Sequence, residues 1–218
     1  MAYAALIAGA TGLIGGQLLA QVGKFNDYGH VIAIARRPLA ASAHVETRIV
    51  NFDALAPADC AGADVIFCAL GTTIKKAGSQ DAFQRVDLGY VKRLAKTSHA
   101  AGAKQFVLVS SIGADANSSN FYLRVKGEVE QAITAMPFRA IHIFRPSLLL
   151  GARNESRAGE GIGQALMPVL NPILVGGLRK YRAIPAADVA RAMAVAPLQT
   201  PAGTHTYEYD QIMALARG

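Results

Sequence analysis

Residues 4–16 have the sequence AALIAGATGLIGG, an apolar run that leads into glycines spaced Gly-x-x-Gly-x-x-Gly. A glycine turn between a strand and a helix is typical of dinucleotide-binding folds, although ordinary turns of this kind also use glycine. Gly9 permits the tight turn, Gly12 lets the backbone approach a pyrophosphate, and Gly15 lets the helix pack against the sheet. Amides at the helix N-terminus would then meet the phosphates. The predicted cofactor contacts of this turn are Gly9, Thr11, Gly12, Leu13, Ile14 and Gly15.

Short apolar runs alternate with longer segments of helical character along most of the chain. Continuous apolar strands are typical of a parallel sheet that is buried on both faces. Strands joined by helices predict a doubly wound parallel sheet, which is an α/β Rossmann fold in three layers. The predicted strands are Ala4–Ala8, Val31–Ala35, Thr47–Val50, Val65–Leu70, Gln105–Ser110 and Ala140–Phe144. The predicted helices are Gly12–Val22, Ala82–Ala101 and Phe121–Met136.

The regular alternation weakens after Arg145 and Pro146. Residues 151–181 are rich in Gly, Pro and Arg, and a further short helix is predicted from Pro185. Neither a linker nor an internal repeat divides the chain, so residues 1–218 are predicted to form a single NAD(P)-binding domain. Within it, residues 147–182 are expected to form a short irregular region that walls the substrate pocket.

Composition excludes several classes of protein. The chain has 218 residues, 52% of them hydrophobic, which is enough for a core without disulfides or a structural metal. Its two cysteines form no disulfide framework and its five histidines lack metal-ligand spacing, so no metal site is expected. The basic residues behind the net charge of +7 are scattered along the chain, which favours an anionic cofactor over nucleic acid as the ligand. No secretory signal or membrane span is visible, so a cytoplasmic location is expected.

Two arginines follow the second predicted strand and indicate which dinucleotide is bound. NAD-binding folds place Asp or Glu about 20 residues past the glycines to hold the ribose 2′-hydroxyl. This chain has Arg36 and Arg37 instead, and guanidinium groups suit a 2′-phosphate, so NADP(H) is favoured. The alternative is that both arginines are simply solvated at the end of a strand. The ends of the third and fourth strands are also expected at the cofactor, unless they are ordinary turns. Their predicted contacts are Asp53, Leu70, Gly71 and Thr72.

Tyr122 is the one tyrosine with a lysine four residues later, at Lys126. Positions i and i+4 share a helix face, so the phenol and the ammonium can address one site, although such pairs are also common on helix surfaces. A nearby ammonium favours the phenolate, which lets Tyr122 exchange a proton with a carbonyl oxygen while Lys126 holds the nicotinamide ribose. Ser110 ends the fifth predicted strand, where its hydroxyl could stabilise a developing oxyanion. Ser111 is the reserve, and a turn or capping serine is the alternative.

Together these motifs resemble the short-chain dehydrogenase/reductase superfamily. The stretches VSSIGAD (109–115), SSNFY (118–122), RPSLLL (145–150) and RNESR (153–157) are similar to its atypical, short-form branch, which includes the Tat-interacting-protein oxidoreductase. The resemblance implies an active site and cofactor contacts at Ser110, Tyr122, Lys126, Arg36, Arg37, Leu149 and Arg157. One departure is Asp87, because many members of the superfamily have a catalytic asparagine there. It puts the asparagine-based proton relay in doubt.

These expectations point to an NADPH-dependent oxidoreductase that transfers hydride to or from a small carbonyl or alcohol substrate. Two alternatives stay open: a non-catalytic NADP(H) sensor that regulates a partner protein, and an epimerase or isomerase with bound cofactor. A nucleotide sugar is not expected as substrate, because the chain lacks the large carboxyl-terminal domain of the sugar epimerases. A homodimer is a common expectation for relatives.

Overall fold

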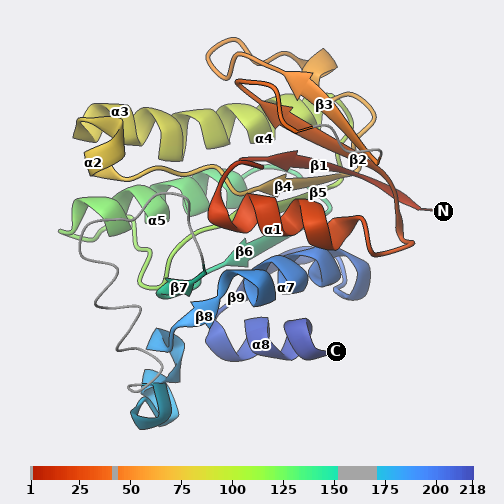
Figure 1. Cartoon of the computed structure of the whole chain (residues 1–218). Coiled ribbons are helices and arrows are strands. Elements are labelled where there is room, and N and C mark those ends of the chain that lie inside the picture. Colours follow the sequence, from red (N-terminus) through yellow and green to blue (C-terminus); the bar gives the residue numbers. More distant parts are fainter. Residues whose placement is uncertain (1, 41–43, 152–170) are drawn as a thin grey trace.

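A seven-stranded parallel sheet runs through the centre of the protein (Figure 1). The computed structural model describes residues 2–40, 44–151 and 171–218. Across the sheet, the strands are β3 (Val45–Ile49), β2 (Tyr28–Ala35), β1 (Tyr3–Ala8), β4 (Val65–Cys68), β5 (Gln105–Val109), β6 (Ala140–Phe144) and β9 (Gly203–Tyr207). Every neighbouring pair is parallel, so the carboxyl ends of these strands meet at one edge of the sheet.

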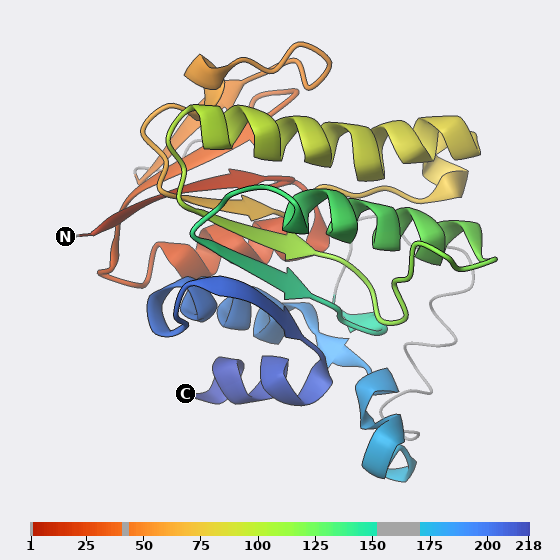
Figure 2. The same ribbon diagram turned by 180° about the vertical axis from the view of Figure 1, so that it is seen from behind.

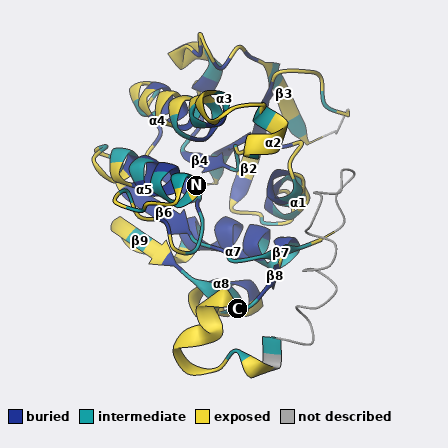
Figure 3. Ribbon diagram, turned by 90° about the vertical axis from the view of Figure 1, so that its left-hand side faces the viewer, coloured by how far each residue is buried: buried dark blue, intermediate teal, exposed yellow. Residues whose placement is uncertain are grey.

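Helices cover both faces of this sheet, with α4 and α5 on one face and α1 and α7 on the other (Figures 1 and 3). The helices are α1 (Leu13–Val22), α2 (Ile74–Ala77), α3 (Gln80–Gln84), α4 (Val91–Ala100), α5 (Phe121–Thr134), α7 (Ala186–Gln199) and α8 (Tyr209–Arg217). Seen from behind, α8 packs outside α7 (Figure 2). One core includes Leu18 and Met193, and the other includes Leu94 and Ile133. The predicted three-layer Rossmann fold is confirmed.

The strand order reverses between β1 and β4. From β1 the chain winds outward to β2 and β3, then returns to β4 and winds outward in the other direction. Ligands of doubly wound sheets bind at such a reversal, outside the carboxyl ends of the strands. The loops after β1 and β4 touch here, since a Cβ atom on Gly9 would lie 2.4 Å from the Ala69 carbonyl oxygen. The fold therefore brings the glycine turn and the Leu70 loop to one place.

The predicted helix over Ala82–Ala101 is interrupted by a π-helical turn. In the structure, α3 leads into this turn at Arg85–Tyr90, and α4 continues from Val91. A π-helical turn holds one residue more than an α-helical turn, and such turns are frequent at functional sites. It places Asp87 on the buried side of the segment. Apolar periodicity gives no local signal for this change of register.

The end of the chain is more regular than the sequence predicts. β7 (Leu149–Leu150) pairs with β8 (Ile184–Pro185), and 3₁₀ turns span Asn171–Ile173 and Gly176–Tyr181. The predicted short helix from Pro185 is the 14-residue α7, and it leads into β9. The sequence analysis missed β9 because GTHTY is a short, polar strand with a mostly exposed surface. Residues 152–170, part of the predicted pocket wall, lie outside the described residues.

A buried hydrogen-bond network ties this last strand to the sheet and to α7. The His142 ring on β6 places Nδ1 3.0 Å from the Tyr207 hydroxyl and Nε2 3.2 Å from Gln105 Oε1. Gln105 in turn donates to the Pro197 carbonyl in α7 at 3.3 Å. Burial, with a smaller contribution from the neighbouring His205, lowers the pKa of His142 to about 4. His142 is therefore neutral in the folded protein near neutral pH.

Acid is expected to destabilise the fold through His142. Between pH 6.5 and about 4, the unfolded chain binds a proton at this residue that the folded chain does not bind. The resulting contribution, about 3 kcal/mol, is fully present above this range and is lost as the pH falls through it. Urea unfolding at about pH 7 and about pH 4.5 should show a weaker pH dependence for His142→Gln than for the wild type. The same substitution at exposed His44 serves as control, and identical pH dependence in all three proteins would contradict this assignment.

Candidate cofactor and active site

The glycine turn after β1 has the shape that its spacing predicts. Gly9 has a φ of +90°, and a side chain there would collide with Ala69, so the position requires glycine. A Cβ atom on Gly15 would lie 2.0 Å from the Gly9 carbonyl oxygen, which shows how closely α1 packs against the turn. No side chain caps α1 at Gly12, and its first turn contains no acidic residue. The uncapped amides suit an anion such as a phosphate.

The remaining residues of this turn differ in how far their side chains are exposed. Thr11 is exposed and Leu13 is half-buried, whereas the Ile14 side chain is part of the core, so only its backbone can face a ligand. Gly151, which follows β7, would place a Cβ atom 3.0 Å from Leu13 Cδ1. Strand β7, which carries Leu149, therefore borders the glycine turn at its carboxyl end.

Charged groups gather after β2 and β3. Arg36 and Arg37 are exposed, and within the described residues neither forms an ion pair. Asp53 accepts hydrogen bonds from Arg85 Nε at 3.0 Å and from the Tyr90 hydroxyl at 2.9 Å, and the Arg85 guanidinium holds the pKa of Asp53 below its ordinary value. Burial and Asp53 raise the pKa of Tyr90, while Arg36 acts in the opposite direction. Arg36 therefore lies close to the Asp53 cluster, and the sequence predicts both residues as cofactor contacts.

The loop after β4 carries the predicted contacts Leu70, Gly71 and Thr72. Leu70 and Thr72 are half-buried, and Gly71 is exposed. The Thr72 amide donates to Asp87 Oδ2 at 2.9 Å, and a Cβ atom on Gly71 would lie 3.4 Å from Asp87 Oδ1. The loop is thus held against the Asp87 carboxylate. Arg157, the other predicted contact, lies outside the described residues.

Helix α5 brings Tyr122 and Lys126 together. The helix starts after Asn120, whose side chain accepts a hydrogen bond from the Leu123 amide at 3.1 Å. Tyr122 is 36% exposed, and its ring lies 5.8 Å from the Phe83 ring and 5.9 Å from Lys126 Nζ. Lys126 is buried, with a side chain only 7% exposed. The predicted pair therefore combines an accessible phenol with an enclosed ammonium on one face of α5.

Lys126 is paired with Asp87, the residue at which the sequence departs from the family pattern. Its Nζ donates to Asp87 Oδ1 at 2.8 Å, and the Asp87 side chain is 1% exposed. Burial is the largest single influence and works to lower the pKa of Lys126, but Asp87, Tyr122 and Cys68 together outweigh it, so the pKa is raised. The ammonium at this site is held in its charged form.

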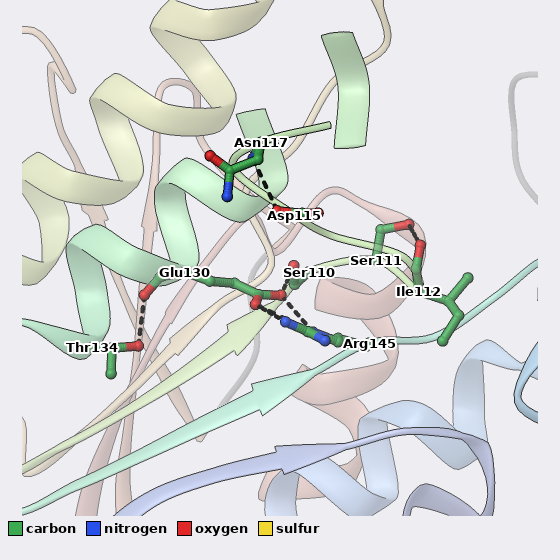
Figure 4. A network of polar contacts seen from close by, with 8 residues as sticks. All are labelled: Ser110, Ser111, Ile112, Asp115, Asn117, Glu130, Thr134 and Arg145. Atoms are coloured by element: carbon green, nitrogen blue, oxygen red, sulfur yellow. Dashed lines mark hydrogen bonds and ion pairs between the residues drawn. The ribbon is translucent and has the colours of Figure 1, made fainter. Parts of the chain in front are cut away.

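Ser110 lies at the end of β5, but its hydroxyl is already engaged. It donates to the Glu130 carboxylate, which also binds Arg145 through two guanidinium nitrogens (Figure 4). Ser110 is only 5% exposed, and within the described residues no hydrogen bond joins it to Tyr122 or Lys126. Ser111 is half-buried, and its hydroxyl donates to the Ile112 carbonyl at 3.3 Å. Figure 4 shows that the two hydroxyls have different neighbours.

Three residues that were not predicted from the sequence hold this region together. Glu130 and Arg145 join α5 to the end of β6. A Cβ atom on Gly127 would lie 2.0 Å from the Ala116 nitrogen, so only glycine lets α5 approach the loop after β5 so closely. The available signal was the spacing of Lys126 and Glu130, two charged residues four apart on the otherwise apolar face of α5.

Other chemistries find little support in the described part of the chain. There, no helix is long and apolar enough to cross a membrane, and no three His, Cys, Asp or Glu side chains are placed to hold a metal ion. Both cysteines are buried and free, and burial raises the pKa of Cys60 to about 11 and that of Cys68 to about 12.

Comparison with known proteins identifies the family. A family model described as NAD(P)H-binding matches residues 9–164. Protein HTATIP2 from Rattus norvegicus is 42% identical over 194 residues, which cover 86% of this chain and 78% of that protein. The mitochondrial protein FMP52 from Debaryomyces hansenii is 35% identical over 203 residues, which cover 89% of this chain and 88% of that protein.

Solved structures show the same fold at low sequence identity. MoeE5, in complex with UDP-glucuronic acid and NAD, has a TM-score of 0.71 at 18% identity and covers 93% of this chain and 75% of its own. The dTDP-glucose 4,6-dehydratase DesIV from Streptomyces venezuelae, with NAD and TYD bound, has a TM-score of 0.71 at 16% identity, with 93% and 74% covered. The chain belongs to the NAD(P)H-binding family, in the atypical short-chain dehydrogenase/reductase branch with HTATIP2 and FMP52.

Proposed function

We propose that this protein is an NADPH-dependent oxidoreductase that transfers hydride to or from a small carbonyl or alcohol substrate. The observation that carries the proposal is an accessible Tyr122 phenol beside the buried Lys126 ammonium, on the helix that borders the sheet edge. Membership of the NAD(P)H-binding family supports a dinucleotide at the adjoining strand ends. A sensor would need the dinucleotide site, but it has no need of this tyrosine and lysine.

The residues present suit NADP(H). The tight Gly9 turn and the uncapped start of α1 would hold the pyrophosphate, and the exposed Arg36 and Arg37 would hold a 2′-phosphate. Lys126 would hold the nicotinamide ribose. When bound, the dinucleotide supplies or accepts the hydride.

The remaining chemistry belongs to the protein. The Tyr122 hydroxyl would pass a proton to the substrate oxygen during reduction, or take it back during oxidation. The Lys126 ammonium favours the phenolate that remains after proton transfer. The Phe83 ring, 5.8 Å away, packs beside the Tyr122 ring and limits its orientation. The enclosed Lys126 ammonium would therefore stabilise charge, and the accessible Tyr122 phenol would transfer the proton.

One of the two serines would orient the substrate oxygen. The sequence favours Ser110, but its buried hydroxyl is committed to Glu130, so the geometry favours the reserve, Ser111. We expect Ser111→Ala to lower kcat by about 10²-fold, as for loss of an oxyanion donor, with unchanged stability. Ser110→Ala should instead lower the midpoint of urea unfolding, because it leaves the Glu130 carboxylate with one partner fewer. Loss of turnover in Ser110→Ala alone, at unchanged stability, would return the role to Ser110.

Removal of the two arginines should weaken NADPH binding selectively. Hydrogen bonds to a charged group are worth about 1.5–3 kcal/mol, so the double variant Arg36→Ala/Arg37→Ala should bind NADPH about 10- to 100-fold more weakly. NADH, which lacks the 2′-phosphate, should bind almost as before. Arg217→Ala removes an exposed arginine on α8 and is the control. Equal weakening for both nucleotides would contradict the proposed 2′-phosphate site.

Turnover is best tested with NADPH that carries deuterium at the transferable position, offered with a panel of small aldehydes and ketones. The proposed function predicts deuterium in the alcohol product and one NADPH consumed for each product molecule. An isomerase, which returns the substrate's own hydride, would show no net consumption of NADPH. A sensor would bind the nucleotide and do neither.

The wider expectations are part of the same proposal. Residues 1–218 would act as one NAD(P)-binding domain, with residues 147–182 walling the pocket for a small-molecule substrate, and no nucleic acid would be bound. A cytoplasmic location and a homodimer are also proposed. Because the FMP52 relative is named as mitochondrial, cell fractionation is the direct test of location, and light scattering tests the dimer.

A further inference from the structure

We propose that Asp87 is a positioning residue, whose carboxylate holds the Lys126 ammonium and the loop after β4 in one fixed arrangement. The inference deepens the proposed function and rests on it. Three elements that border the expected nicotinamide ribose site meet at this one side chain: the π-helical turn, the β4 loop and α5.

The geometry divides the two oxygens of Asp87 between two donors. Oδ1 accepts from Lys126 Nζ at 2.8 Å, and Oδ2 accepts from the Thr72 amide at 2.9 Å. Both partners can only donate, so the residue between them must offer two acceptors. A carboxylate does this, whereas the asparagine usual in the superfamily would turn its NH₂ group toward one of the donors. The aspartate is therefore matched to this site and does not simply replace the asparagine.

The π-helical turn explains how Asp87 reaches this position. The residue is 1% exposed in its side chain, whereas Asp81 and Arg85 on the same segment are exposed. The facing loop lies against the carboxylate, since a Cβ atom added at Gly71 would lie 3.4 Å from Oδ1, an ordinary contact. The helical irregularity thus places the buried acid against the loop after β4.

The charges around Lys126 give the arrangement a measurable consequence. The titratable groups that face it are Asp87 on the π-helical turn, Tyr122 on its own helix and the buried Cys68 thiol on β4. Without Asp87, burial would be opposed only by Tyr122 and Cys68, so we expect the pKa of Lys126 to fall. With Asp87, the ammonium stays charged and keeps two of its three hydrogens for the ribose and for the side of the site that holds Tyr122.

The test follows Lys126 directly by NMR titration of protein labelled with ¹³C at the lysine Cε atoms, with Lys126→Arg used to assign the signal. In the wild type, the Lys126 signal should not titrate before those of the exposed lysines. In Asp87→Asn the Lys126 signal should titrate at lower pH. The affinity of this variant for NADPH should fall at alkaline pH, over the same range in which Lys126 loses its proton. Asp87→Glu should restore the lysine titration in part, because it restores the charge but not the distances. Asp81→Asn, the same change at an exposed position of this segment, should alter neither.

The outcomes separate this inference from the proposed function. If Asp87→Asn folds and its Lys126 titrates as in the wild type, Asp87 does not control the lysine and the inference is overturned. If Asp87→Asn does not fold, the wild-type titration still decides, because a Lys126 signal that titrates before the exposed lysines contradicts the inference. Absence of turnover with every carbonyl substrate would count against the proposed function and leave the lysine titration untouched.

Discussion

Tyr122→Phe is expected to lower turnover by about 10²- to 10⁴-fold, the usual contribution of a positioned acid or base. The substitution removes one oxygen and keeps the ring that packs beside Phe83 and near the Lys126 ammonium. Stability and NADPH affinity should therefore change little. Steady-state kinetics with a substrate found in the carbonyl screen, together with nucleotide titration of the variant, measures both effects.

The matched control for this variant is Tyr3→Phe. Tyr3 begins β1, at the edge of the sheet opposite the strand ends that form the site, so its hydroxyl should not matter for turnover. Turnover in Tyr122→Phe within a factor of about two of the wild type would remove the tyrosine from the proposed mechanism. The sensor hypothesis would then become the better account of the glycine turn and of the arginines after β2.

Gly15→Ala is expected to damage both the fold and the cofactor site. The added Cβ atom would lie 2.0 Å from the Gly9 carbonyl oxygen, a backbone atom that cannot turn away. Helix α1 must therefore move off the turn, which disturbs the amides proposed to hold the pyrophosphate. We expect the free energy of unfolding to fall by about 1–3 kcal/mol, the range for overpacked positions, and NADPH affinity to fall at least about tenfold.

The adjacent glycine provides the control for this prediction. At Gly16 the nearest atom to an added Cβ is the Ala10 carbonyl oxygen at 3.6 Å, an ordinary contact. Alanine is also the better helix former, so Gly16→Ala should raise the free energy of unfolding by about 0.5–1 kcal/mol and leave nucleotide binding intact. If the two variants behave alike in urea unfolding and in titration, close packing at Gly15 is not what holds the turn.

The sheet could be predicted because its central strands carry a strong local signal. β1, β4 and β5 are continuous apolar runs, as strands with both faces buried must be. β9 could not be found this way, because an edge strand with an exposed surface needs no apolar run. Its place is set by tertiary contacts, such as the Tyr207 hydroxyl that meets His142.

Part of the candidate site could likewise be predicted from local sequence, and part could not. The Tyr122 and Lys126 pair follows from helical spacing alone, and the structure places both on one face of α5. The roles of Glu130 and Asp87 depend on partners 20 and 39 residues away in the chain, namely Ser110 and Lys126. No local pattern encodes such distances. The register of the π-helical turn, which decides whether Asp87 points inward, also depends on packing.

Above all, we propose that the strand ends at the reversal between β1 and β4 bind NADP(H) in preference to NAD(H). Parallel fluorescence titrations of the purified wild-type protein with NADPH and NADH test it most directly. We predict saturable binding of both nucleotides or of NADPH alone, with NADPH at least about tenfold tighter, because only NADPH carries the 2′-phosphate that Arg36 and Arg37 would hold. Binding of neither nucleotide, or tighter binding of NADH, would contradict it.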